Sequence, residues 1–214
     1  MKNTTLRHAA AAAAVLLAGC ATPAPDVSAE FPKMMQASFR DQGIAKVDRL
    51  QQDEANAACS KAEGKPLADD VAGRIQAAAL KTVKPPPSGR YIGDWREGEK
   101  LAQNGRGMTW TDASAAPSAN GGNCYNCHQL DPKEISYGTI GPSLYHYGRN
   151  RGVADLEAPT ARPVIEYTWT KLWNAKAFNA CSGMPRFGHG GLLNEKQLQD
   201  LMALLLDPKS PVNQ

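Results

Sequence analysis

The residues best suited to chemistry form one short run, in which Cys124 and Cys127 stand three positions apart and His128 follows directly. Two thiols on one helical turn can form thioether bonds to the two vinyl groups of a haem, and the adjacent imidazole is then held at the iron. Similar cysteine spacing occurs in thioredoxin-like redox pairs and in half of a zinc site. A thioredoxin-like redox pair would need a surrounding βαβ unit, and a zinc site would need a second pair of closely spaced ligands. The sequence indicates neither. We therefore expect one covalently attached haem c, bound through Cys124 and Cys127, with His128 as an axial iron ligand.

The sixth coordination position of such an iron has three candidate side chains, His146, Met184 and His189. Met184 is favoured, because Gly183 and Pro185 beside it indicate an irregular loop that can point a side chain inward just before the last helix. A neutral thioether stabilises Fe(II) and raises the reduction potential. Ligation by His128 and Met184 therefore predicts electron transfer and leaves no iron position for substrate.

The beginning of the chain is typical of an export signal, residues 1–19, rather than of a folded domain. A positively charged start precedes an apolar stretch, residues 9–18, that is too short to span a bilayer. The stretch ends in Leu17-Ala18-Gly19-Cys20, which resembles the bacterial lipobox, in which the cysteine is lipidated and becomes the N-terminus. The alternative is an ordinary signal peptide cut after Ala24 or Ala29. Either cleavage predicts a periplasmic protein, and the first adds a lipid anchor at Cys20 to a bacterial membrane.

Composition excludes one large class of function. The chain has 24 Lys and Arg against 21 Asp and Glu, a formal net charge of +3, so no strong general positive field is available to hold nucleic acid. Hydrophobic residues make up 42% and charged residues 21%, which is ordinary for a globular protein.

Three consecutive prolines mark the best candidate boundary within the 214 residues. The segment Pro85-Pro86-Pro87-Ser88-Gly89 blocks helix formation and favours an extended linker. It separates a tether at residues 20–29 and a helical N-terminal extension at residues 30–84 from a haem domain at residues 90–214. The extension has a thin core, so we expect it to lie against the haem domain. Its predicted helices cover residues 32–39, residues 45–61 and the residues that follow Pro66.

The predicted fold class is all-α. In the haem domain we expect helices over residues 94–104 and 167–178. A terminal helix begins at Asn194, where Gln197 three positions later completes a capping-box pattern, and it ends at Asp207-Pro208.

The order of these features resembles that of the class I cytochromes c: helix, Cys-x-x-Cys-His, Gly141-Pro142-x-Leu144, covering helix, Met loop and terminal helix. Within that class, several stretches over residues 90–214 resemble the SoxX family, the monohaem cytochrome subunits of SoxAX complexes. These stretches are residues 123–129, 131–134, 138–144, 179–188 and 202–208.

The resemblance implies both a geometry and a reaction. The carbonyl of Pro142 would accept a hydrogen bond from the second ring nitrogen of His128 and so fix the imidazole. The SoxAX complex, an L-cysteine S-thiosulfotransferase, oxidatively joins thiosulfate to a cysteine of the carrier SoxYZ, and the bond-making haem belongs to SoxA. This chain would then accept electrons from SoxA, pass them to a soluble cytochrome c and supply no catalytic residue of its own. We expect the haem edge near Cys124 and Tyr125 to contact SoxA. A stand-alone periplasmic electron carrier is the main alternative, and a haem enzyme or gas sensor is a third.

Counting the five cysteines leaves two without a role. Lipidation or cleavage removes Cys20, and the haem takes Cys124 and Cys127. An even remainder in an oxidising compartment favours a disulfide between Cys59 and Cys181, which would pin the Met loop to the N-terminal extension. The alternative is two unpaired, buried cysteines.

Overall fold

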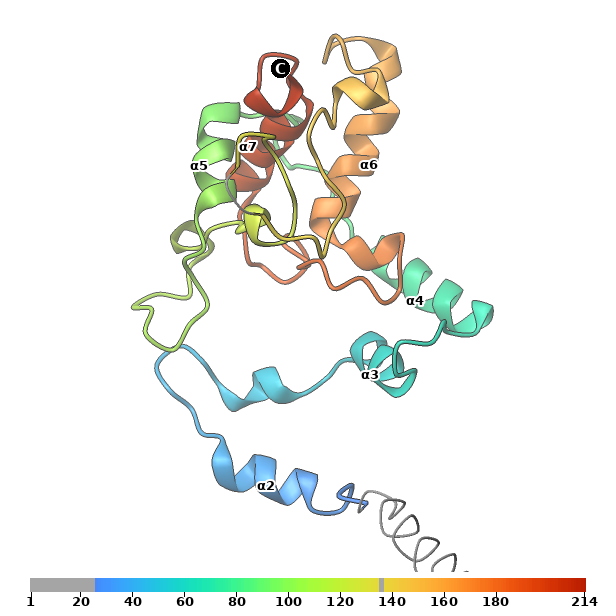
Figure 1. The fold of residues 1–214 in the computed structure, drawn as a ribbon, viewed down its shortest axis with the longest axis vertical. Coiled ribbons are helices and arrows are strands. Elements are labelled where there is room, and N and C mark those ends of the chain that lie inside the picture. Colours follow the sequence, from blue (N-terminus) through green and yellow to red (C-terminus); the bar gives the residue numbers. More distant parts are fainter. Residues whose placement is uncertain (1–25, 135–136) are drawn as a thin grey trace, which may run out of the picture. The chain divides into compact units, whose positions relative to one another are not determined.

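The computed structural model of the chain describes residues 26–134 and 137–214. The predicted export signal and Cys20 lie outside these ranges. Within them the secondary structure consists of α-helices and short 3-10 turns without a strand, so the predicted all-α class is confirmed (Figure 1). None of the helices in these ranges is long and apolar enough to cross a membrane.

The chain divides into two units, one ending at Arg40 and the other comprising residues 41–214. The described part of the first unit contains one helix, α2, Phe31–Ser38, which starts with Pro32 in its first turn, as predicted, and buries none of its residues.

The second unit is organised around its last helix, α7, Glu195–Leu206. The side chain of Asn194 accepts a hydrogen bond from the backbone N–H of Gln197, and the side chain of Gln197 accepts one from the backbone N–H of Asn194. This is the predicted capping box. Every residue from 198 to 206 is buried, so α7 is covered on all its faces.

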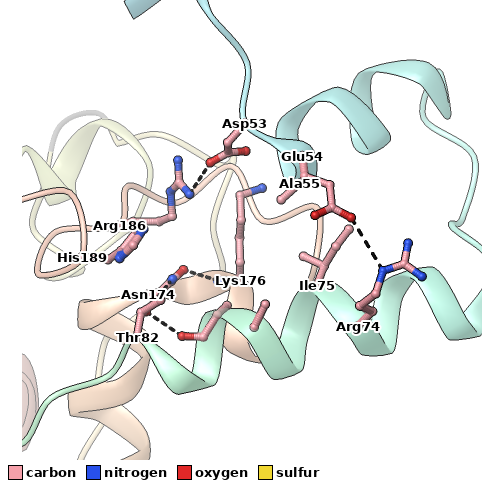
Figure 2. Close-up of a pocket in the computed structure, with 12 residues that line it drawn as sticks. Asp53, Glu54, Ala55, Arg74, Ile75, Thr82, Asn174, Lys176, Arg186 and His189 are labelled. Carbon is pink, nitrogen blue, oxygen red and sulfur yellow. Dashed lines mark hydrogen bonds and ion pairs between the residues drawn. The ribbon is translucent and has the colours of Figure 1, made fainter.

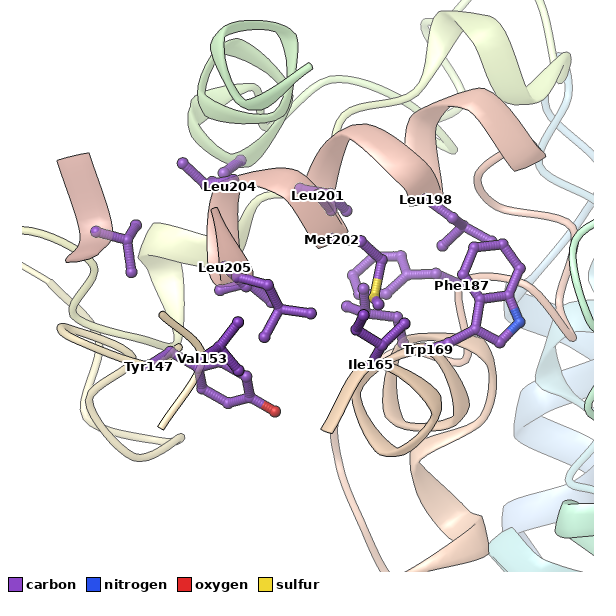
Figure 3. Packing of buried hydrophobic residues seen from close by; sticks show 14 of the residues in the cluster. Tyr147, Val153, Ile165, Trp169, Phe187, Leu198, Leu201, Met202, Leu204 and Leu205 are labelled. Atoms are coloured by element: carbon purple, nitrogen blue, oxygen red, sulfur yellow. The ribbon is translucent and has the colours of Figure 1, made fainter. Parts of the chain in front are cut away.

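Two helices supply most of that cover. On one side lies α6, Arg162–Trp173, and Figure 3 shows Met202 of α7 beside Ile165 and Trp169 of α6. On the other lies α5, Trp95–Gln103, whose contact with α7 is the most extensive between two helices of this unit.

The crossing of α5 over α7 depends on a glycine. A Cβ atom at Gly98 would overlap the backbone carbonyl oxygen of Asp200 and come within 3.0 Å of the Leu204 side chain. The nearly buried carboxylate of Asp200 accepts the Asp94 backbone N–H at 2.8 Å, at the start of α5. The two helices are therefore held in one register by direct backbone proximity and a buried hydrogen bond.

Residues 41–84 of the helical extension belong to this second unit, since the unit begins at residue 41 rather than at the prolines. It contains α3, Glu54–Lys61, and α4, Asp69–Lys81. As expected for a thin core, α3 has no buried residue and α4 has two, Ile75 and Ala79. The α4 helix packs against the short 3-10 turn Ala175–Ala177, so this part of the extension lies against the rest of the unit.

Two predicted helices have different bounds in the structure. The one expected over residues 45–61 is a 3-10 turn, Val47–Leu50, followed by a break and then α3. The break occurs because Asp53 is extended and its side chain accepts the Asn56 backbone N–H, which starts a new helix there. The helix expected over residues 167–178 instead begins at Arg162, with a proline in its first turn, and ends at Trp173.

The glycine crossing gives a stability prediction. Gly98→Ala should lower the free energy of unfolding by about 1–3 kcal/mol, because the new methyl group displaces backbone that cannot rotate away. Gly73→Ala is the matched control, since Gly73 is inside α4 and a Cβ there meets no atom within 4 Å. It should raise stability by about 0.5–1 kcal/mol. Urea unfolding followed by circular dichroism measures both, and equal midpoints for the two variants would contradict the assigned role of Gly98.

Candidate functional site

The two cysteines of the motif lie on one tight turn after α5. The turn Cys124–Asn126 follows Asn123, which has a left-handed backbone with φ of 52°. The backbone N–H of Cys127 donates to the Cys124 carbonyl at 3.1 Å, and that of His128 donates to the same oxygen at 2.8 Å. Both thiols are free and partly buried. Burial raises the pKa of the Cys124 thiol to about 12, the opposite of the lowered pKa that activates a redox cysteine.

The imidazole of His128 is oriented from one side only. Its Nδ1 atom lies 2.7 Å from the carbonyl oxygen of Pro142, the contact that the resemblance implied. Because a carbonyl only accepts, Nδ1 donates in this contact, and the neutral ring that makes it has its lone pair on Nε2. The segment stays close to the ring because the Gly141 backbone N–H donates to the Cys127 carbonyl at 2.8 Å, and a Cβ at Gly141 would overlap the imidazole.

The loop that carries Met184 follows α6 and leads to α7. Met184 is partly buried and packs against the main hydrophobic cluster. Just beyond it Phe187 is buried, and a Cβ at Gly188 would come within 3.0 Å of the ring of Trp173. The indole Nε1 of Trp173 is buried and has no hydrogen-bond acceptor among the described residues. A polar donor is thus left available beside the Met loop.

The other two candidate ligands are placed differently. His146 has a left-handed backbone, its ring stacks on Tyr145 with centroids 3.7 Å apart, and its Nε2 lies 2.7 Å from the carbonyl oxygen of Gln214. This contact engages Nε2 at the C-terminal end of the chain. His189 is exposed and lines a pocket beside α3 and α4, as Figure 2 shows. Of the three, only Met184 is part of the hydrophobic cluster.

The remaining two cysteines are joined as predicted. Cys59 and Cys181 form a disulfide that links positions 122 residues apart, with Cα atoms 5.5 Å apart. Cys59 is on α3, and Cys181 opens the Met loop three residues before Met184. The bridge therefore connects the helical extension directly to that loop.

A second bond joins the same two elements. Arg186 donates to the carboxylate of Asp53 at 2.6 Å. Burial alone would raise the pKa of Asp53. The hydrogen bond from the Asn56 backbone N–H lowers it, as do the hydrogen bond and the charge of Arg186, and together these effects are larger than that of burial. The pKa is therefore held below its usual value of 3.8. This ion pair contributes its full stability above that value and loses it as the pH falls through the lower value of the folded state. Sequence reasoning missed this pair, whose only local signal was the Asp53 helix cap.

Comparison with known proteins gives one informative match. No protein-family model matches the chain. A protein of Aquifex aeolicus (strain VF5) named "Uncharacterized lipoprotein" is 39% identical to it over 132 residues. That similarity covers 62% of this chain and 58% of the relative, so the chain spans somewhat more than half of the relative's length.

The disulfide gives a direct prediction. Peptide mapping of the unreduced mature protein should recover the segments around Cys59 and Cys181 as one linked species that separates on reduction. Thiol counting on the denatured, unreduced protein should find none at these two positions. Recovery of either peptide alone before reduction would show that the two cysteines are unpaired.

Proposed function

We propose that this chain is a periplasmic monohaem c-type cytochrome of the class I kind, with a haem bound through Cys124 and Cys127. The axial ligands are His128 and Met184. The observation that carries the proposal is the bonding of His128: its Nδ1 is engaged by the Pro142 carbonyl, and its Nε2 has no hydrogen-bond partner within residues 26–134 and 137–214. The ring comes directly after two unpaired cysteines on one turn.

The residues present fit such a group. Two partly buried thiols can take thioether bonds, the free imidazole nitrogen and the Met184 thioether can occupy the two axial positions, and the unsatisfied Trp173 indole N–H can donate to an acidic edge of the macrocycle. A thioredoxin-like redox pair is disfavoured, because the buried Cys124 thiol has a raised pKa.

The proposed role is electron transfer. A bound haem c supplies a single one-electron couple. Pro142 fixes the tautomer and ring direction of His128, and the partly buried Met184 side chain packs against the hydrophobic cluster. If His128 and Met184 hold the iron as proposed, their side chains would leave no position for a substrate or a gas.

The more specific proposal is that the chain is the electron-accepting subunit of a SoxAX-type complex. The stretches that resemble the SoxX family surround the candidate site: residues 138–144 lie against the motif, residues 179–188 form the Met loop, and residues 202–208 end α7. Its partner would be SoxA, and the complex would join thiosulfate to a cysteine of SoxYZ. The two electrons released would leave one at a time through this chain to a soluble cytochrome c. The alternative is a stand-alone periplasmic electron carrier with the same ligands.

A lipid anchor is the remaining part of the proposal. Leu17-Ala18-Gly19-Cys20 resembles a lipobox, and the Aquifex relative is named a lipoprotein. Both favour lipidation of Cys20, which would hold the mature chain on a bacterial membrane.

The ligand assignment has a spectroscopic test. The ferric protein should show the weak near-infrared band of Met–Fe(III) ligation, and Met184→Ala should abolish it. His146→Ala and His189→Ala remove the rival ligands, and Met108→Ala removes an exposed methionine, so all three should keep the band. A band that survives in Met184→Ala would refute the assignment.

The partner assignment is tested by purification. The native protein, isolated under mild conditions from membranes and periplasm, should copurify with a larger haem protein. If the larger protein is SoxA, the two chains together should join thiosulfate to SoxYZ and reduce added oxidised cytochrome c, and neither chain alone should do so. Isolation as a single haem chain that exchanges electrons with a soluble cytochrome would favour the stand-alone carrier.

A further inference from the structure

One short helix contacts the proposed ligand loop on both sides of Met184. At the start of α3, its cap residue Asp53 accepts a hydrogen bond from Arg186 at 2.6 Å, two residues after Met184. Near the end of α3, Cys59 is bonded to Cys181, three residues before Met184. We call these two links, the Asp53–Arg186 ion pair and the Cys59–Cys181 disulfide, the α3 clamp.

We propose that the α3 clamp is a positioning device that keeps Met184 on the haem iron by holding both ends of its loop. The inference rests on the proposed function, since it needs Met184 to be a ligand. It assigns to the N-terminal extension a role at the iron that neither the motif nor the resemblance gives it.

Apart from the packing of the Met184 side chain against the hydrophobic cluster, the loop between the two links has little support of its own. Cys181, Gly183 and Pro185 are exposed, and a Cβ at Gly183 would meet no atom within 4 Å. The Met184 backbone N–H donates only within the loop, to the Ser182 hydroxyl at 3.3 Å. Firm support begins after Arg186, where Phe187 is buried. The part of the loop that carries the thioether therefore depends on links at its two ends.

On the upstream side one further contact assists the disulfide. Lys176, which is only 5% exposed, donates from Nζ to the carbonyl oxygen of Ala180 at 3.0 Å, directly before Cys181. Figure 2 shows Lys176 rising beside Asp53 and Arg186 at the pocket between α3 and α4. The Asp53 carboxylate thus faces two cations, of which Arg186 is hydrogen-bonded to it and Lys176 supports the start of the loop.

The dependence is mutual, because α3 has few other attachments. It has no buried residue, and its ion pair with α4, between Glu54 and Arg74, spans 3.6 Å between exposed side chains. Such exposed pairs contribute little. The clamp therefore holds α3 and the Met loop to each other, and breaking it frees both.

Loosening the clamp should increase the fraction of molecules in which Met184 has left the iron. An added ligand such as imidazole binds only that fraction, so its apparent affinity reports the population directly. The holoprotein should bind imidazole more tightly when the clamp is broken, and the Met–Fe(III) band should disappear at a lower temperature than the helical signal. A purely structural role would move the two thermal midpoints together.

Two variants break one link each in the full-length holoprotein. Asp53→Asn removes the charge but retains a good helix cap, and it should lower the apparent Kd of imidazole about two- to fivefold. Cys59→Ser combined with Cys181→Ser removes the bridge and should lower it about tenfold or more. Glu166→Gln is the matched control, because it removes an exposed ion pair of the same 2.6 Å length to Arg162 on α6, and its imidazole affinity should equal that of the parent.

The outcomes separate the inference from the proposed function. The clamp is supported if the Met–Fe(III) band is lost at a lower temperature than the helical signal and the clamp variants bind imidazole more tightly than the parent. A parent that carries the band, together with clamp variants that bind imidazole as the parent does, overturns it. A parent without the band, or one whose band persists in Met184→Ala, instead refutes the ligand assignment. Should the serine pair not accumulate, the Asp53→Asn result decides alone.

Discussion

The structure of the second unit depends on the close crossing of α5 over the buried helix α7. Because a glycine faces the Asp200 backbone, the two helices approach more closely than side chains would allow, and α7 can then be buried along nine consecutive residues. The buried Asp200 carboxylate is paired with Lys196 at 2.6 Å. It also accepts a hydrogen bond from the backbone N–H of Asp94, the residue that caps the start of α5. An isolated buried carboxylate would be costly, and the ion pair with Lys196 compensates the charge of Asp200. The same carboxylate fixes the register of α5 on α7.

That register carries over to the loops that follow α5 and precede α7. The Gly122 backbone N–H, just before the cysteine motif, donates to the Leu101 carbonyl on α5 at 2.8 Å. The Gln197 side chain on α7 donates to the Asn120 carbonyl at 3.1 Å, and the buried Asn120 side chain donates to the Leu192 carbonyl at 2.9 Å. The segment before the motif and the end of the Met loop are therefore bonded to each other through one asparagine. Two segments 72 residues apart in sequence, at Asn120 and Leu192, are thus bonded to each other beside the locked pair of helices.

Several features that depend on residues close together in the sequence were predicted correctly. The capping box of α7 and the tight cysteine turn each depend on neighbouring residues, and the structure has both features. The Pro142 contact with His128, which the resemblance implied, is present as well. The disulfide was predictable because cysteine counting left only two positions. The start of α6 at Arg162 was also signalled locally, by the proline that follows, but the helix predicted over residues 167–178 began five residues late.

Contacts between distant residues were not predictable in this way. Asp53 signalled a helix start that the prediction passed over, yet its bond to Arg186, 133 positions away, has no signature in either segment. The contact of His146, one of the three candidate ligands, with the Gln214 carbonyl 68 positions away likewise has no signature in the sequence around either residue. Both results depend on tertiary placement, which no local pattern encodes.

The compartment proposed for the chain and the stability of its site are physically linked. A disulfide persists in an oxidising compartment and is reduced in the cytosol, so the bridge between α3 and the Met loop can last only after export. The bridge closes a span of 122 residues, for which the chain-entropy model gives about 4–5 kcal/mol as an upper value. The accompanying ion pair is partly exposed and contributes at most about 1 kcal/mol. The disulfide is therefore the dominant link, and the helical extension, although it buries little, gains its hold on the ligand loop through a bond that only the exported protein can keep.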